Sequence, residues 1–154
     1  MDIKKHLNVL NKKEQSSILK LVDKKLTRIP NCPGLQTYPD LHECEELEPL
    51  VKNLKKYIPG NFTIKKCWAN HTDGGYVSWH QHPTELSVVY YLKNKESIGT
   101  FFKIDGKEVP SESPENSLII FKGDEVHSVP PRKKGAIDRY SIAFDIDKER
   151  GAHV

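Results

Sequence analysis

From Phe62 to Asp145 the sequence is a succession of short runs rich in β-branched and aromatic residues, separated by turn signals such as Asp105-Gly106 and Lys122-Gly123-Asp124. Short runs with regularly spaced turns are typical of all-β sandwiches and barrels. Histidines near the ends of two runs favour one such architecture, the double-stranded β-helix or jelly roll. The predicted strands are Phe62–Asn70, Tyr76–His82, Leu86–Leu92, Gly99–Ile104, Ser117–Phe121, Glu125–Val129 and Asp138–Asp145.

The first sixty residues have instead the spacing of helices. Asn11 is followed three residues later by Glu14, a capping-box pattern, and apolar residues then recur at intervals of three and four until Pro30. A shorter helical pattern covers Asp2–Leu10, and another helix is predicted from Glu46 or Pro49 to Tyr57. We expect these helices to pack on a sheet.

The length of the chain, 154 residues, predicts a single domain. We expect that domain, 1–154, to consist of a helical packing segment, 1–60, and a double-stranded β-helix core, 62–146. The predicted fold class is therefore mainly β with N-terminal helices.

Composition argues against several classes of function. A net charge of +3 is too small to favour nucleic-acid binding, and three cysteines without C-x-x-C spacing fit a reducing compartment. No apolar run approaches the roughly 18 residues of a membrane span, and the first thirty residues lack the apolar stretch of a signal peptide. We therefore expect a soluble cytoplasmic protein (in the host cytoplasm if viral) that binds neither membrane nor nucleic acid.

Two histidines separated by one residue, His80 and His82, stand just before an apolar run. Residues i and i+2 of a strand point to the same face, so the two imidazoles form half of a metal site. His127, where a turn leads into another β run, is the best candidate for the third ligand. Three histidines would leave metal positions open for substrate and oxygen.

A rival ligand pair precedes these histidines. His71 and Asp73 form an H-x-D pattern, which is the more familiar arrangement for iron sites with two histidines and one carboxylate. The pair runs directly into Gly74-Gly75, a turn signal, so we rank it second.

The segment 138-DRYSIAFDI-146 alternates strictly, with Arg139 and Ser141 on one face and apolar side chains on the other. An arginine inside a barrel is costly unless it meets an anion, and a guanidinium holds a carboxylate through two parallel hydrogen bonds. Ser141 could add a hydroxyl to the same carboxylate. In the alternative, Arg139 points outward and pairs with Asp138 or a neighbour, and the apolar character of the opposite face favours this arrangement.

Taken in order, these motifs resemble the iron(II)- and 2-oxoglutarate-dependent oxygenases. The similarity follows W-x-N, H-x-H-P, L-S-x-V-Y-Y-L-K, G-T-F-F, H-S-V-x-P and R-x-S-I-A-F, all within residues 62–146. It is closest to a branch common in phage and bacterial genomes, which uses H-x-H where most relatives use H-x-D. The resemblance implies a dioxygenase (hydroxylase) that requires iron(II) and converts the cosubstrate 2-oxoglutarate to succinate.

The resemblance also implies roles for particular residues. The iron ligands would be His80, His82 and His127, with no further catalytic residue. Arg139 would anchor the distal carboxylate of 2-oxoglutarate. Further contacts to that cosubstrate would come from Ser141, Tyr91 and Asn70. The mouth of the substrate site would be lined by Tyr76, Trp79 and Lys103.

The sequence departs from the usual pattern of these oxygenases in three places. Val88 stands where close relatives often have glycine, and Phe121-Lys122-Gly123 replaces F-P-[ST]. His82 occupies the usual carboxylate position, and a neutral ligand leaves the metal centre one charge more positive. If His82 is not a ligand, the oxygen donor could instead be Asp73, Glu85 or Asp124.

Two other functions remain open from the residues alone. A cupin-type enzyme would use the same three histidines without 2-oxoglutarate, since residues 74–85 nearly match the first cupin motif. A non-catalytic jelly-roll binding module would instead work through the basic front of the chain, where residues 1–28 carry eight Lys and Arg against three Asp and Glu. The oxygenase reading leaves the substrate open between a small molecule and a peptidyl residue, and the sequence specifies no oligomeric state.

Overall fold

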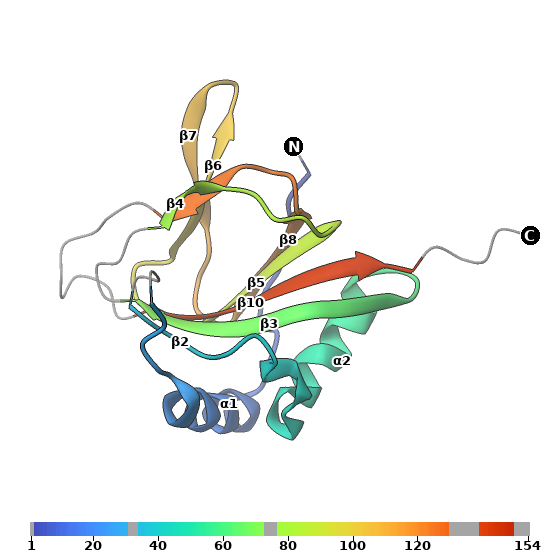
Figure 1. Ribbon diagram of the computed structural model, residues 1–154, viewed down its shortest axis with the longest axis vertical. Coiled ribbons are helices and arrows are strands. Elements are labelled where there is room, and N and C mark those ends of the chain that lie inside the picture. Colours follow the sequence, from blue (N-terminus) through green and yellow to red (C-terminus); the bar gives the residue numbers. More distant parts are fainter. Residues whose placement is uncertain (1, 31–33, 73–76, 130–138, 150–154) are drawn as a thin grey trace, which may run out of the picture.

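The computed structural model describes residues 2–30, 34–72, 77–129 and 139–149. Two antiparallel sheets face each other, and two helices, α1 (Lys12–Lys25) and α2 (Glu48–Tyr57), lie beneath the larger sheet (Figure 1). The protein is therefore mainly β with N-terminal helices, and its fold is a double-stranded β-helix, as the sequence predicts.

The larger sheet has the strand order β1-β8-β5-β10-β3-β2, and the smaller sheet has the order β4-β9-β6-β7. The strands of the larger sheet are β1 (Lys4–His6), β8 (Ser117–Lys122), β5 (Leu86–Asn94), β10 (Arg139–Lys148), β3 (Phe62–Thr72) and β2 (Leu35–Gln36). Those of the smaller sheet are β4 (Val77–His80), β9 (His127–Val129), β6 (Ile98–Ile104) and β7 (Lys107–Glu112). Strands that are distant in sequence, such as β5 and β10, thus lie side by side in one sheet, which forms one wall of the interior.

The predicted capping box is present at the start of α1. The side chain of Asn11 accepts a hydrogen bond from the Glu14 N–H at 2.8 Å, and the Glu14 side chain accepts one from the Asn11 N–H at 3.0 Å. Two short 3-10 helices, η1 (Leu41–Glu43) and η2 (Glu45–Leu47), lead into α2. None of the described helices is long and apolar enough to cross a membrane.

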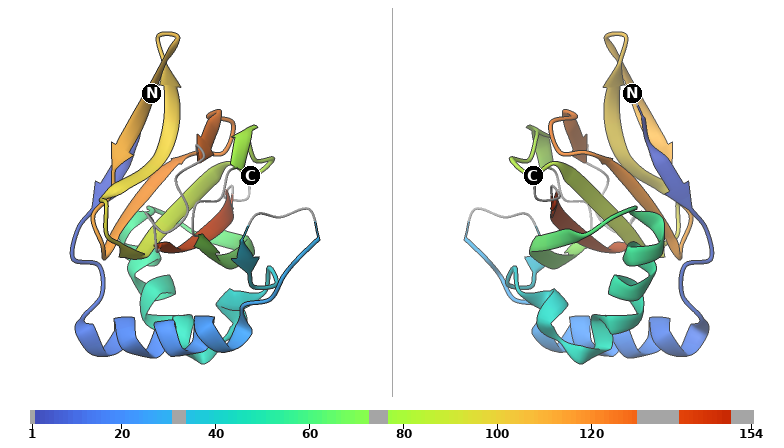
Figure 2. Two further views of the ribbon diagram at one scale, coloured as in Figure 1. Left: turned by 90° about the vertical axis from the view of Figure 1, so that its left-hand side faces the viewer. Right: turned by 90° about the vertical axis from the view of Figure 1, so that its right-hand side faces the viewer.

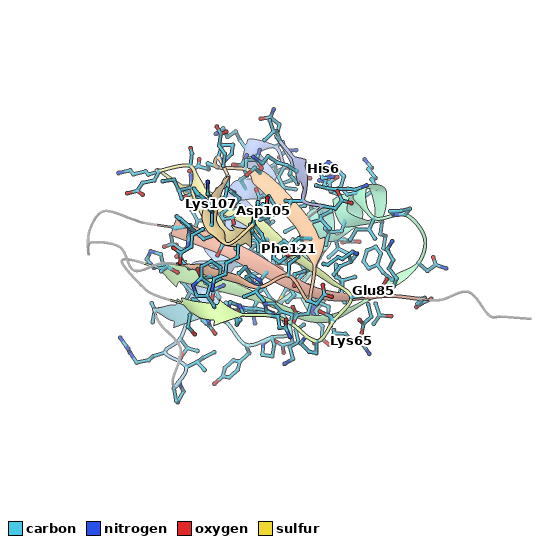
Figure 3. The ribbon with its side chains drawn as sticks, turned by 90° about the horizontal axis from the view of Figure 1, so that it is seen from above. His6, Lys65, Glu85, Asp105, Lys107 and Phe121 are labelled. Atoms are coloured by element: carbon cyan, nitrogen blue, oxygen red, sulfur yellow. The ribbon has the colours of Figure 1, made fainter. Side chains whose placement is uncertain are left out.

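Two apolar clusters hold the layers together. The first joins the helices to one face of the larger sheet, where Leu50 and Leu54 of α2 are buried with Ile142 and Phe144 of β10. The second lies on the interior side and contains Tyr91, Phe102, Ile119 and Phe121. Phe121 lies near the middle of the molecule when it is seen from above (Figure 3). The helices thus cover one face of the larger sheet and leave its other face to the interior.

The prediction of a helix over Asp2–Leu10 is wrong. Residues 4–6 form strand β1, which pairs antiparallel with β8 along the edge of the larger sheet. The apolar positions that suggested a helix face different environments, since Leu7 is 58% exposed whereas Leu10 is buried. Pairing with a neighbouring strand has overridden a short helical pattern.

Strand β7 was not expected from the sequence. It is almost wholly exposed and forms a hairpin with β6 that projects away from the helices (Figure 2). It is also an edge strand, which tolerates Pro110 within it. A strand without a buried face has no alternating pattern that a sequence could reveal.

Candidate metal centre

Three histidines from different segments meet inside the jelly roll. His80 is the last residue of β4 and pairs in register with His127, the first residue of β9. His82 lies just beyond β4 rather than on it, and its backbone N–H is held by the carbonyl of Gly123 at 2.7 Å. One ring nitrogen from each histidine lies within 4.8 Å of one from each of the others. No other such group of histidine, cysteine or carboxylate side chains occurs in the described part of the chain.

The Nδ1 atom of each of these rings already faces an oxygen. For His80 it is the carbonyl of Ser78 at 2.8 Å, and for His127 it is the carbonyl of Glu125 at 2.7 Å. Nδ1 of His82 lies 3.1 Å from Oδ1 of Asp145, an ion-pair distance, although the N–H is not aimed well enough for a hydrogen bond. Oxygen partners at Nδ1 leave Nε2 of each ring as the nitrogen able to bind a metal.

Burial keeps two of the rings neutral. It lowers the pKa of His127 to about 4, although the hydrogen bond to the carbonyl of Glu125 acts in the opposite direction. Burial also lowers the pKa of His80, and the carbonyl of Ser78 acts in the opposite direction. A neutral imidazole has a lone pair to donate, so these rings are ready as metal ligands at neutral pH.

On its interior face, the larger sheet carries side chains in rows across the strands, because residues in register share a face. The polar row consists of Ser117, Tyr91, Ser141 and Asn70. The next row, which we call the apolar row, consists of Ile119, Val89, Ala143 and Trp68. The third row contains Phe121, Ser87, Asp145 and Lys66. Ser141 and Asp145 are four residues apart on β10, or about 13 Å, so the polar row and the histidines are separated by the apolar row.

Arg139 begins β10 on the same side of the strand as Ser141. It is 4% exposed, in register with Asn94, and its Nη1 donates to the carbonyl of Ile98 at 3.1 Å. Arg139 therefore does not point to solvent. Asp138, its suggested partner, lies outside the described residues. The apolar face of β10, which had argued against an inward arginine, packs against the helices.

Tyr91 and Asn70 flank Ser141 in the polar row. The Tyr91 hydroxyl accepts a hydrogen bond from the Thr100 N–H at 3.0 Å and lies 2.8 Å from the Thr100 hydroxyl. Asn70 is half-buried beside them. The structure thus brings the four residues predicted to bind the cosubstrate onto adjacent strands and one face.

The rival ligands lie elsewhere. His71 is on the face of β3 opposite Asn70, and its ring stacks on Tyr140 at 4.1 Å between centroids. Asp73 lies outside the described residues. Glu85 and Asp124 are exposed and do not belong to the histidine group.

Two of the residues predicted at the substrate mouth contact each other. The ammonium of Lys103 lies 4.5 Å from the ring centroid of Trp79. Trp79 precedes His80 and Lys103 follows Phe102, and the side chains of His80 and Phe102 point to the interior. Strand alternation therefore places Trp79 and Lys103 on the outer face of the smaller sheet. Tyr76 lies outside the described residues.

The architecture is shared with solved structures of known proteins. HygX from Streptomyces hygroscopicus, with nickel, 2-oxoglutarate and hygromycin B bound, superposes with a TM-score of 0.75 at 10% identity over 95% of this chain and 82% of its own. A viral collagen prolyl hydroxylase from Paramecium bursaria Chlorella virus-1, in its 2OG complex, gives 0.69 at 17% identity over 96% of both chains. A Pseudomonas putida prolyl-4-hydroxylase gives 0.70 at 15% over 96% and 93%.

The chain has the fold of these proteins. No protein-family model and no curated protein matches the sequence. The likeness therefore establishes the shared jelly roll, and function has to be argued from the residues themselves.

Two residues near the histidines were missed in the sequence. Asp145 is buried behind His82, and Trp68 of β3 lies with its ring centroid 6.1 Å from that of His82. Both lie on the interior face of the larger sheet, as Ser141 does. Extending the alternation of β10 two residues beyond Ala143 would have found Asp145.

Gly123 connects the loop that carries His82 to the loop that leads into His127. Its carbonyl accepts from the His82 N–H, its own N–H donates to the carbonyl of Glu85 at 3.0 Å, and a Cβ placed on it would overlap the carbonyl oxygen of Thr84. We expect Gly123→Ala to destabilise the protein by about 1–3 kcal/mol and to weaken metal binding by displacing His82. Chemical unfolding and metal titration measure both effects, with Lys122→Ala as an exposed neighbouring control. Wild-type values for Gly123→Ala would show that these loops tolerate the methyl group.

Proposed function

We propose that the chain is an iron(II)- and 2-oxoglutarate-dependent dioxygenase whose iron is held by His80, His82 and His127. The observation that carries the proposal is the convergence of three inward-facing imidazoles in a jelly-roll interior that also buries an arginine. Three protein ligands leave coordination positions open, which an oxygenase needs for its cosubstrate and for O₂.

In this proposal Arg139 and the polar row bind 2-oxoglutarate. The guanidinium of Arg139 holds the distal carboxylate, because a planar fork of donors matches two carboxylate oxygens. Ser141 adds its hydroxyl, and Tyr91 and Asn70 complete the polar surroundings. Burial of Arg139 supports this role, since a guanidinium removed from water strongly favours an anionic partner.

The remaining residues orient the reactants and exclude water. Bound iron(II) would supply the oxygen chemistry that consumes O₂ and 2-oxoglutarate, places one oxygen atom in succinate and one in the hydroxylated substrate, and releases CO₂. The rings of Phe102 and Phe121 lie 6.1 and 4.9 Å from that of His127 and keep that side of the site dry. The apolar row does the same between the histidines and the polar row.

The substrate class is proposed as a small molecule or a peptidyl residue. HygX was solved with hygromycin B, and a prolyl hydroxylase of similar fold from Trichoplax adhaerens was solved with a peptide fragment. Trp79, Lys103 and Tyr76 stay predictions for the substrate mouth. The H-x-H branch, the single domain over 1–154 and the cytoplasmic location also stay predictions from the sequence.

The proposal is tested by adding iron(II) and 2-oxoglutarate to the protein without oxygen. We expect a metal-to-ligand charge-transfer absorption, because the cosubstrate binds the metal directly, and succinate formation once air is admitted, even in the absence of a substrate. Protein without iron is the control for succinate. Absence of both the band and succinate would contradict the proposal and favour a non-catalytic binding module.

A further inference from the structure

We propose that Asp145 is a positioning residue for His82, and that its carboxylate supplies from behind the ring the negative charge that a directly bound carboxylate usually supplies to such a centre. This inference rests on the proposed function. It concerns His82 in particular, the ligand at which the chain departs from the usual H-x-D pattern.

The three histidines differ in the partners of their Nδ1 atoms. His80 and His127 face backbone carbonyls, which are neutral acceptors available in any sequence. His82 alone faces a side-chain carboxylate, with 3.1 Å between its Nδ1 and Oδ1 of Asp145. A carboxylate behind a metal-bound imidazole fixes the tautomer and raises the basicity of the metal-binding nitrogen more than a carbonyl does. The carboxylate of Asp145 therefore lies behind His82, the one ligand that replaces the usual carboxylate of the H-x-D pattern.

The surroundings of Asp145 give it no other charged partner among the described residues. It is 5% exposed, and although Lys66 stands in register with it on β3, that lysine is exposed and forms no ion pair with it. Oδ1 is buried without a hydrogen bond. A buried carboxylate oxygen in that condition is destabilising, so packing alone does not explain the residue.

The neighbouring strand is irregular beside this carboxylate. The register between β10 and β3 shifts between Asp145 and Ile146, where Lys65 of β3 is the extra residue. Such irregularities are frequent beside functional sites. A turn of the His82 ring would place its N–H on Oδ1, and metal binding at Nε2 supplies a reason for that turn.

The test compares wild type with Asp145→Asn, which preserves shape and removes the charge. We expect iron(II) and manganese(II) affinities, measured without oxygen, to fall about 10- to 100-fold. We also expect the charge-transfer band of the iron(II)–2-oxoglutarate complex to move to shorter wavelength, because a less electron-rich metal gives up an electron less readily. Asp145→Glu should recover part of both effects. A merely structural role would leave the wavelength of the band unchanged.

Fold damage is excluded by the unfolding temperature of the metal-free protein. It should be no lower in Asp145→Asn than in wild type, since Oδ1 has no hydrogen bond to lose. Asp147→Asn makes the same acid-to-amide change two residues along β10 and keeps an oxygen for the Glu85 N–H, so it should bind metal as wild type does. Wild-type affinity and band position in Asp145→Asn would overturn this inference alone. A wild-type protein that binds no metal would overturn the proposed function together with it.

Discussion

Replacing His80 with alanine is expected to abolish metal binding and succinate formation. Two histidines would remain, and the loss of a ligand exceeds the roughly 10- to 100-fold loss that removal of a supporting partner causes. We therefore expect metal affinity to fall by more than about 100-fold. His80 is only half-buried at the end of an edge strand, so the variant should fold normally. This separates ligand loss from unfolding better than substitution of the buried His127 would.

The measurement is metal titration under nitrogen, followed by the succinate assay in air. His71→Ala is the matched control, because it removes another imidazole whose ring stacks on Tyr140 on the far face of the larger sheet. It should retain metal binding and activity. If His71→Ala lost the metal while His80→Ala kept it, the H-x-D pair would be the true ligand set and the proposed centre would be wrong.

Strands with a buried face could be predicted from the sequence, and strands without one could not. The runs that became β3, β5 and β8 carry apolar side chains that pack against a cluster, and that packing is what their pattern records. The exposed β7 and the edge strand β1 are defined by pairing partners distant in the chain. Local periodicity contains no information about those partners.

The candidate site was predictable where spacing along one strand defines a face. Arg139 and Ser141 follow that rule, and their face could be chosen only once the helices were seen to cover the opposite one. His82 lies beyond the end of β4, so its convergence with His80 depends on a loop held by Gly123 rather than on strand alternation. Asp145 became meaningful only when the fold placed His82 beside it.

Replacing Arg139 with alanine should remove cosubstrate binding while leaving the metal in place. Truncating one partner of a buried charged pair costs about 2–5 kcal/mol, so the 2-oxoglutarate concentration needed for half-saturation should rise roughly 30-fold or more. Arg139→Lys should fall between alanine and wild type, because a lysine keeps the charge but not the two-pronged geometry. Ser141→Ala should cost less, about 1 kcal/mol. Titration of the charge-transfer band with 2-oxoglutarate measures all three.

The same titrations, made on wild type and on Arg139→Ala, also separate the two enzyme classes that the histidines allow. The metal affinity of the variant without cosubstrate should match wild type. Arg139 and the histidines lie on opposite sides of the apolar row, so Arg139 does not contact the metal ligands. Folding has to be checked, because the substitution removes the hydrogen bond from Arg139 to the carbonyl of Ile98. The metal titration provides that check, since the three histidines meet only in the folded chain. A folded variant that binds metal and still binds 2-oxoglutarate as wild type does would contradict the anchor role. A wild-type protein that binds metal but gives no charge-transfer band with 2-oxoglutarate would favour a three-histidine enzyme of the cupin type, which uses no 2-oxoglutarate.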